Sequence, residues 1–418
     1  MEKYKEYKDS GVQWLGEIPS HWKAVLNGRI FKEDVRKALD TDISLSLSQK
    51  NGLIPTEEMQ ESSLKTSSYA NWKHVTPCDL VINRFKAHLG VMFASNYTGM
   101  VSFHYGVFKS VMPTNSKYYE YLFHTNVYKF LYADVSNGMT VGLQNLSNTA
   151  FYKVRGLYPP LAEQHSIVSY LDTKCSQLDT LLSNKEKEIS LLQEMKQRVI
   201  ADAVTRGINP SVKFKTTNIP WLPEIPEHWG KVKLKVLTLE GKNKNSENLE
   251  TNVLSLSYGK IIRKKNINEG LVPSDYATYQ IVDVDDIILR LTDLQNDHRS
   301  LRCGLVKERG IITSAYVCLK IRQGVSEYFY FLLHSFDIKK VFYSMGGGLR
   351  QSMNYTEVSK LRVPVPPLSE QRSIVSYITE RASKIDLLIE KLNKEIECIK
   401  EYKQCLISDV VTGQVKVC

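Results

Sequence analysis

The chain contains an internal duplication, and this feature restricts its possible folds more than any other. The segment WLGEIPSHW at 14–22 recurs as WLPEIPEHW at 221–229, with seven of nine residues identical. The segment PPLAEQHSIVSY at 159–170 recurs as PPLSEQRSIVSY at 366–377, with ten of twelve identical. Both pairs are 207 residues apart, as are VIADAVT at 199–205 and LISDVVT at 406–412. Three matches in one register predict two copies of a unit of about 207 residues.

Between the matched blocks the two copies diverge. Residues 23–140 and 230–347 share only short fragments, such as LSLS at 45–48 and 254–257. Each copy therefore consists of a constant frame around a variable insert. The divergence could reflect drift of loops, or the two inserts could perform one task on different targets. Because each insert exceeds 100 residues and contains strand-like segments, we favour the second interpretation.

Each copy ends in a segment that is typical of a long helix. Residues 162–206 contain no proline or glycine, and apolar residues recur there at heptad spacing. The same pattern returns after residue 366, and Lys196 and Lys403 occupy equivalent seam positions. The predicted seam residues are Leu171, Leu178, Leu182, Ile189, Leu192, Lys196, Ile378, Ile385, Ile389, Leu392, Ile396 and Lys403. We expect the helices to pair antiparallel within one chain. Packing of each helix on its own domain only, or pairing between two chains, are the alternatives.

The predicted fold class is α+β, with two globular α/β domains joined by two long helices that form an antiparallel coiled coil in a pseudo-two-fold molecule. The expected boundaries are 1–158 for the first domain, 159–207 for the central helix, 208–365 for the second domain and 366–418 for the C-terminal helix. A hydrophobic content of 42% and a charged content of 24% are ordinary for globular proteins.

Charge and motifs limit the function classes. The net charge of +10 favours a polyanionic partner such as nucleic acid. The seven cysteines contain no CxxC pair and the nine histidines do not cluster, so we expect no metal site. The N-terminus lacks the apolar core of a signal peptide, and no apolar run reaches the roughly 20 residues of a membrane span, so we expect a cytoplasmic protein.

Two groups of polar residues in each insert are candidates for DNA contacts. The first group follows a short buried-strand pattern, and the second follows a glycine-rich turn near the end of the insert. Arg, Lys, Asn and Gln are the side chains that read base edges and bind phosphates. For any one of them a solvated surface role is the alternative. The candidates are Arg84, Lys86, His88, Gln144, Asn145, Arg290, Gln295, Arg299, Arg302, Arg350 and Gln351.

No catalytic signature is evident. The chain has no methyl-donor motif, Walker box, HExxH or GxSxG, so we expect a binding protein without a cofactor of its own. A single-chain methyltransferase or nuclease and a protein-binding scaffold are the rival interpretations.

The paired WLGEIPSHW/WLPEIPEHW and PPLAEQ/PPLSEQ blocks, the helices ending in VIADAVTRG and LISDVVTGQ, and the divergent inserts together resemble the specificity subunits of type I restriction–modification systems. The resemblance covers essentially the whole chain. It implies two target recognition domains that each read half of a bipartite site in double-stranded DNA, and a coiled coil that sets their spacing. It also implies a non-catalytic subunit that binds two modification subunits, which methylate adenine with S-adenosylmethionine, and restriction subunits as further partners.

Overall fold

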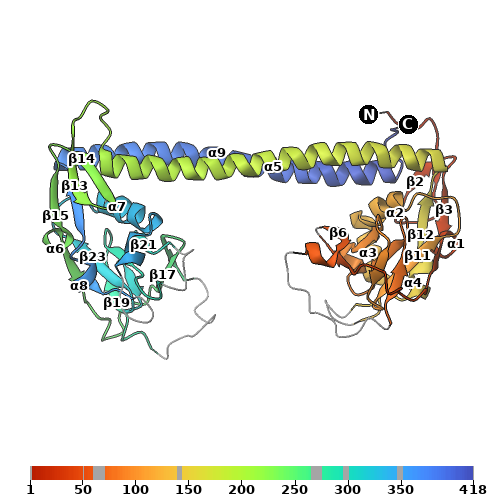
Figure 1. The fold of residues 1–418 in the computed structure, drawn as a ribbon, viewed down its shortest axis with the longest axis horizontal. Coiled ribbons are helices and arrows are strands. Elements are labelled where there is room, and N and C mark those ends of the chain that lie inside the picture. The colour runs from red at the N-terminus through yellow and green to blue at the C-terminus, as the bar shows by residue number, and fades with distance from the viewer. Residues whose placement is uncertain are drawn as a thin grey trace. The chain divides into compact units, whose positions relative to one another are not determined.

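The computed structural model describes residues 2–49, 51–59, 71–138, 144–264, 275–294, 301–345 and 352–417. The chain divides into two compact units, Met1–Lys185 with Asn393–Cys418, and Glu186–Leu392. Two unbroken helices, α5 (Leu161–Arg206) and α9 (Leu368–Val411), each contribute one half to each unit (Figure 1). No described helix is both long and apolar enough to cross a membrane.

The first unit is built around a four-stranded antiparallel sheet in the order β4-β11-β8-β9. Two-stranded pairs β1-β2, β3-β12, β5-β6 and β7-β10 complete it, and α2 to α4 pack beside the sheet. Its elements are β1 (Tyr7–Asp9), β2 (Glu17–Pro19), β3 (Lys23–Leu26), α1 (Asn27–Ile30), β4 (Phe31–Glu33), β5 (Leu45–Ser48), β6 (Gly52–Pro55), η1 (Thr56–Glu58), β7 (Lys73–Val75), β8 (Leu80–Asn83), η2 (Ala87–Leu89), β9 (Met92–Ala94), β10 (Gly99–Val101), β11 (Tyr105–Ser110), α2 (Ser116–Phe123), α3 (Asn126–Val135), α4 (Asn148–Lys153) and β12 (Arg155–Tyr158).

The second unit repeats this topology. Its four-stranded sheet has the order β16-β23-β20-β21, and β13-β14, β15-β24, β17-β18 and β19-β22 are its two-stranded pairs. Its elements are β13 (Phe214–Ile219), β14 (Leu222–Pro226), β15 (Gly230–Lys233), α6 (Leu234–Leu237), β16 (Thr238–Gly241), β17 (Leu254–Ser257), β18 (Lys260–Arg263), β19 (Gln280–Val282), β20 (Ile287–Leu289), β21 (Cys303–Leu305), β22 (Gly310–Ile312), β23 (Val317–Ile321), α7 (Ser326–Ile338), η3 (Val341–Ser344), α8 (Tyr355–Val358) and β24 (Arg362–Val365). The predicted duplication is therefore a duplication of fold as well as of sequence.

The matched sequence blocks form the joint between each domain and the helix that follows it. Glu163, in the first turn of α5, accepts hydrogen bonds from Trp22 Nε1 at 2.9 Å and pairs with His21 Nε2 at 2.6 Å. In the second unit Glu370 binds Trp229 Nε1 at 3.0 Å and His228 Nε2 at 2.8 Å. A carboxylate in a first helical turn also suits the helix dipole. The indole and imidazole rings thus join the frame to the helix, which is a structural role.

The two long helices pack antiparallel in both units. In the first unit Lys403 Nζ lies 2.6 Å from Asp179 Oδ1, and in the second Lys196 Nζ lies 2.6 Å from Asp386 Oδ2. The two ion pairs occupy equivalent positions, 207 residues apart. Along α5 from 171 to 199 and α9 from 378 to 406, the residues that are at least partly buried are those at the predicted heptad positions. The alternative in which each helix packs only on its own domain is therefore wrong.

Each domain also contacts the far end of the helix that returns to it. Tyr118 in α2 donates a hydrogen bond to the carbonyl of Val411, and Tyr328 in α7 does the same to Val204. The main core of the first unit combines domain residues with Ile167, Leu171 and Val410 of the helices. Because helix ends and domain share one core in each unit, the domain is held rigidly on its helix pair.

Candidate functional site

In each unit the segment after a central strand lies beside the segment that precedes the last short helix. Leu146 N donates a hydrogen bond of 3.0 Å to the carbonyl of Arg84, which directly follows strand β8. In the second unit Met353 N donates one of 2.8 Å to the carbonyl of Leu291, after strand β20. Both donors and both acceptors are related by the 207-residue offset. The exit of a central strand and the segment after the glycine-rich turn therefore form one surface in each unit.

Arg84 is held in place by a network of charges. Its Nη2 lies 2.5 Å from Glu33 Oε1 and 2.9 Å from Asn148 Oδ1. Lys73 Nζ lies 2.8 Å from the same Glu33 oxygen, and the Asn148 amide donates to the other one. Burial raises the pKa of Glu33, but the hydrogen bond and charge of Lys73 and the charge of Arg84 outweigh it, so the pKa lies below its ordinary value. An ionised Glu33 thus orients a guanidinium that is one quarter exposed.

Exposed aromatic rings lie beside this network. Phe85 is 43% exposed and Phe103 is 49% exposed, and the His104 ring lies 5.9 Å from the first and 3.9 Å from the second, between centroids. Lys86 is exposed beside them. The contact residues predicted from the sequence did not include Phe85, Phe103 or His104. The available signal was the position of 103–104 in a turn between two strands.

The remaining candidates of the first unit differ in exposure. Asn145 is exposed, and its backbone forms two hydrogen bonds with that of Asn137. His88 and Gln144 are half-buried, and His88 Nδ1 and Gln144 Oε1 have no hydrogen-bond partner among the described residues. We call Arg84, Phe85, Lys86, Phe103, His104, Gln144 and Asn145 the first candidate surface.

In the second unit, the prediction that Arg302 contacts DNA needs correction, because the Arg302 side chain is fully buried. Its guanidinium donates to the carbonyls of Thr292 at 2.7 Å, Asp293 at 3.1 Å and Arg290 at 3.2 Å, and its Nε donates to the Tyr343 hydroxyl at 3.0 Å. Arg302 therefore shapes the loop that follows β20.

Arg290, at the start of that loop, is half-buried. Gln295, Arg299, Arg350 and Gln351 lie outside the described residues. The described part of the second candidate surface is consequently the loop from Arg290 to Leu294 with Ser352 and Met353 beside it. Asp293 N donates to Ser352 Oγ at 3.4 Å, which links the two segments.

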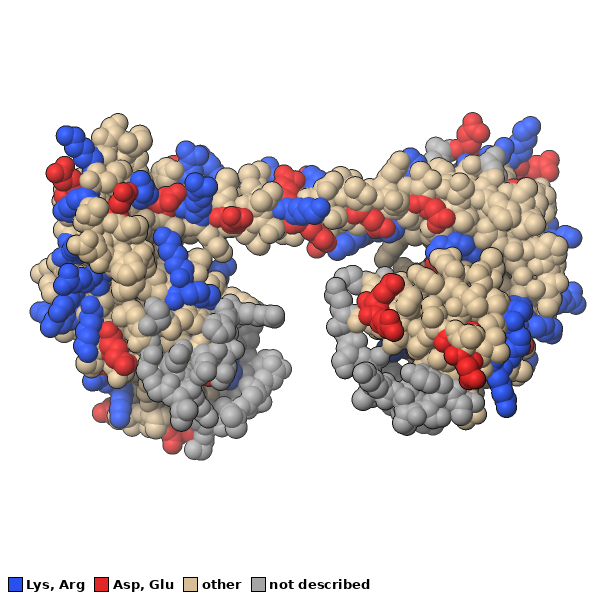
Figure 2. Space-filling view, viewed as in Figure 1, with Lys and Arg blue, Asp and Glu red and all other residues tan. Residues whose placement is uncertain are grey.

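The described surface carries both signs of charge. On the face that Figure 2 shows, Lys and Arg alternate with Asp and Glu along the helices. Within the described part of the chain, no group of three or more His, Cys, Asp or Glu residues could hold a metal ion. The first candidate surface can donate hydrogen bonds, stack aromatic rings on a ligand and pair its Arg and Lys with anionic groups, and the described part of the second can form hydrogen bonds.

Comparisons with known proteins agree with this arrangement. Residues 304–398 match a family model described as the type I restriction modification DNA specificity domain. The chain is 26% identical over 283 residues to a putative type I restriction enzyme MjaX specificity subunit of Methanocaldococcus jannaschii, which is 66% of this chain and 63% of that protein. It is 28% identical to the type I restriction enzyme MjaVIII specificity subunit of the same organism. This match covers 293 residues, or 66% of this chain and 65% of that protein. Each match thus spans less than two thirds of the relative.

Solved structures share the fold. One of them comes from work on the complex assembly and conformational transition of the type I R-M system. It aligns with a TM-score of 0.72 at 12% identity, over 95% of this chain and 99% of the other. The HsdS subunit of Thermoanaerobacter tengcongensis aligns with a TM-score of 0.54 at 14% identity, over 95% and 98%. The predicted resemblance is confirmed: the chain is similar to proteins described as type I restriction enzyme specificity subunits and shares the fold of these solved structures.

Proposed function

We propose that this chain is the DNA-recognition subunit of a type I restriction–modification complex. Each unit binds one half of a bipartite site in double-stranded DNA, and the paired helices set the distance between the half-sites. Two modification subunits dock on the chain, and restriction subunits complete the complex. The chain is non-catalytic and uses no cofactor, since S-adenosylmethionine belongs to the modification subunits. Its place of action is the cytoplasm.

The observation that carries this proposal is the pair of candidate surfaces at equivalent positions in two equivalent folds. The first presents Arg84, Lys86 and exposed aromatic rings, whereas the second is built from a loop ordered by the buried Arg302. Identical frames with different reading surfaces suit a molecule that must bind two different sequences in the same manner. Base-edge contacts supply such sequence specificity, and phosphate contacts supply position.

The helix pair supports the spacing role. Both helices are unbroken, and the pairs Lys196–Asp386 and Lys403–Asp179 fix their register at two equivalent points. A lysine at a seam position buries less apolar surface than a leucine would, and single polar seam residues are known to specify register. Precise register would serve a molecule whose helix length must match a fixed distance along DNA.

Exposed apolar side chains on the helices support docking of a partner there. In the first unit Leu181 is 41% and Tyr402 is 50% exposed, and in the second Leu388 is 47% and Met195 is 46% exposed. Leu181 corresponds to Leu388 and Met195 to Tyr402 at the 207-residue offset. Apolar exposure that recurs in both copies is typical of a surface that a partner covers.

The test is the methylome of the source cell with and without this gene, read by single-molecule sequencing. We expect methyladenine at one bipartite motif to disappear on deletion and to return when the gene is restored on a plasmid. Unchanged methylation in a cell whose modification subunit co-purifies with this chain would contradict the proposal.

A second readout separates DNA recognition from a protein-binding scaffold. Phosphate contacts make the affinity for DNA fall steeply with salt. We expect binding of the assembled complex to its site to weaken as salt rises and to withstand competitor DNA that lacks the site. Binding that is insensitive to both would favour the scaffold.

A further inference from the structure

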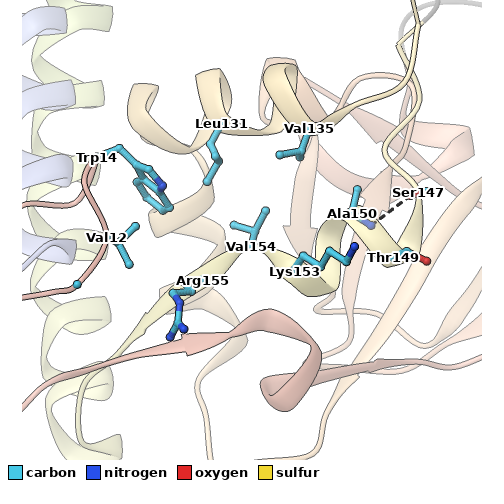
Figure 3. A pocket seen from close by; sticks show the side chains of 11 residues that line it. Val12, Trp14, Leu131, Val135, Ser147, Thr149, Ala150, Lys153, Val154 and Arg155 are labelled. Atoms are coloured by element: carbon cyan, nitrogen blue, oxygen red, sulfur yellow. Dashed lines mark hydrogen bonds between the residues drawn. The ribbon is translucent and has the colours of Figure 1, made fainter.

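The first unit contains a pocket of about 540 Å³ that neither candidate surface includes (Figure 3). It lies between the loop joining β1 to β2, the C-terminal half of α3, and α4. Trp14, Leu131, Val135 and Val154 form its apolar part, and Lys153 and Arg155 stand at its edge. Both cations are exposed, and neither forms an ion pair with the part of the chain that the structure describes.

The walls of this pocket are held by contacts within the first unit. The Trp14 ring packs edge-on against Tyr128, with 5.2 Å between the ring centroids. The Tyr128 hydroxyl donates to the carbonyl of Arg155 at 2.9 Å, and Arg155 Nη1 donates to the carbonyl of Ala24 at 3.0 Å. A preorganised pocket of this kind loses little entropy on binding.

The key residues of the pocket recur in the second unit. Trp221, Lys360 and Arg362 lie 207 residues after Trp14, Lys153 and Arg155. Trp221 lies between β13 and β14 as Trp14 does between β1 and β2, Arg362 begins β24 as Arg155 begins β12, and Lys360 lies in the turn after α8. Lys360 and Arg362 are exposed. Trp221 is half-buried, and its Nε1 has no acceptor among the described residues.

Core packing does not require cations at these exposed positions. In each unit only the residue between the two cations, Val154 or Leu361, is buried. The neighbouring inserts have diverged almost completely. A tryptophan and two cations that recur in both copies therefore fit a partner that binds both units in the same way, in contrast to the surfaces that differ.

We propose that the Trp14–Lys153–Arg155 pocket and its Trp221–Lys360–Arg362 counterpart are docking sites for one acidic segment with a large apolar side chain, presented by a partner protein that binds in two copies. The apolar side chain enters against the tryptophan, and carboxylates of the same segment pair with the two cations. This inference rests on the proposed function, in which the modification subunit is the component bound twice. It adds a second contact to the docking surface on the helices.

The experiment co-expresses the full chain with the modification subunit of its system and counts bound copies by native mass spectrometry. The variants are K153E/R155E, K360E/R362E and all four together. We expect each double variant to lose at least tenfold in affinity at one of the two sites, and the quadruple variant to lose it at both. Lys8 and Lys23 are exposed lysines of the same unit outside the pocket, so K8E/K23E is the charge-matched control.

A second variant tests the apolar part without changing charge. Ala150 lines the pocket, so A150W should fill it and weaken one site as the charge reversal does, with an unchanged melting temperature. Two copies bound at wild-type affinity by both double variants would overturn the inference, and so would an equal loss in the control. A wild-type chain that binds no modification subunit would instead contradict the proposed function itself.

Discussion

Single residues decide which side chains can reach a ligand. Arg84 directly follows strand β8 and Arg302 directly precedes strand β21, yet Arg84 is partly exposed and Arg302 is buried under its own loop. A carboxylate orients Arg84, whereas the guanidinium of Arg302 donates hydrogen bonds to backbone carbonyls. The two arginines therefore predict different consequences of substitution.

Replacing Arg84 with alanine should weaken the assembled complex on its DNA site about tenfold, the loss typical of one specific side-chain contact. The melting temperature should fall only slightly, because the guanidinium is partly exposed. Fluorescence anisotropy on the identified site measures the affinity. Arg29→Ala changes an exposed arginine on α1 of the same unit and serves as the control. A variant that binds as tightly as wild type would remove Arg84 from the reading surface.

Glu33 gives a pH-dependent prediction. Its folded pKa is depressed, so its stabilising contribution is present above the unfolded value of about 4.5 and disappears as pH falls through the folded pKa. Glu33→Gln should lower the free energy of unfolding by about 2 kcal/mol at pH 7, the loss expected for hydrogen bonds to a charged group. The difference from wild type should shrink as pH falls below about 4.5 toward the folded pKa. Urea unfolding at pH 7 and at successively lower pH measures this difference, and a constant difference would contradict the assignment.

At the scale of elements, periodicity predicted more than residue type did. The heptad positions from Leu171 to Val199 coincide with the partly buried side of α5, because a 3.5-residue repeat needs only the identity of apolar residues. The burial of Arg302 could not be predicted, since its partners are backbone carbonyls of a loop whose course depends on the fold. The contacts of Glu163 with His21 and Trp22 could not be predicted for the same reason, although all three residues lie in matched blocks.

The proposed function depends on the length of the helix pair. Deleting residues 182–188 and 389–395 removes one heptad from each helix and leaves the Lys196–Asp386 and Lys403–Asp179 pairs in register. At 1.5 Å per residue the helices shorten by about 10 Å, equivalent to about three base pairs at 3.4 Å each. We expect an altered gap between half-sites or loss of assembly, read from the methylome. Full activity with unchanged spacing would refute the spacing role.

At the scale of the whole molecule, the duplication separates what must stay constant from what can vary. The joints at Glu163 and Glu370 and the contacts of Tyr118 and Tyr328 are equivalent in the two units. The inserts between these fixed points differ in almost every surface residue. Each insert should nevertheless be exchangeable without disturbing the other unit, because the contacts that it makes with the helices, such as that of Tyr118 with Val411, lie within its own unit.

Replacing residues 23–140 with the corresponding insert of another specificity subunit tests this separation. The swap removes Arg84, Phe85 and Phe103 but leaves the second unit and the joint residues His21, Trp22 and Glu163 in place. We expect one half of the methylated motif to change and the other half, with the gap, to stay as in wild type. Exchange of 230–347 should change the opposite half, which makes the two chimaeras controls for each other. A change in both halves, or in neither, would show that recognition is not divided between the units, and the duplicated frame would then need another explanation.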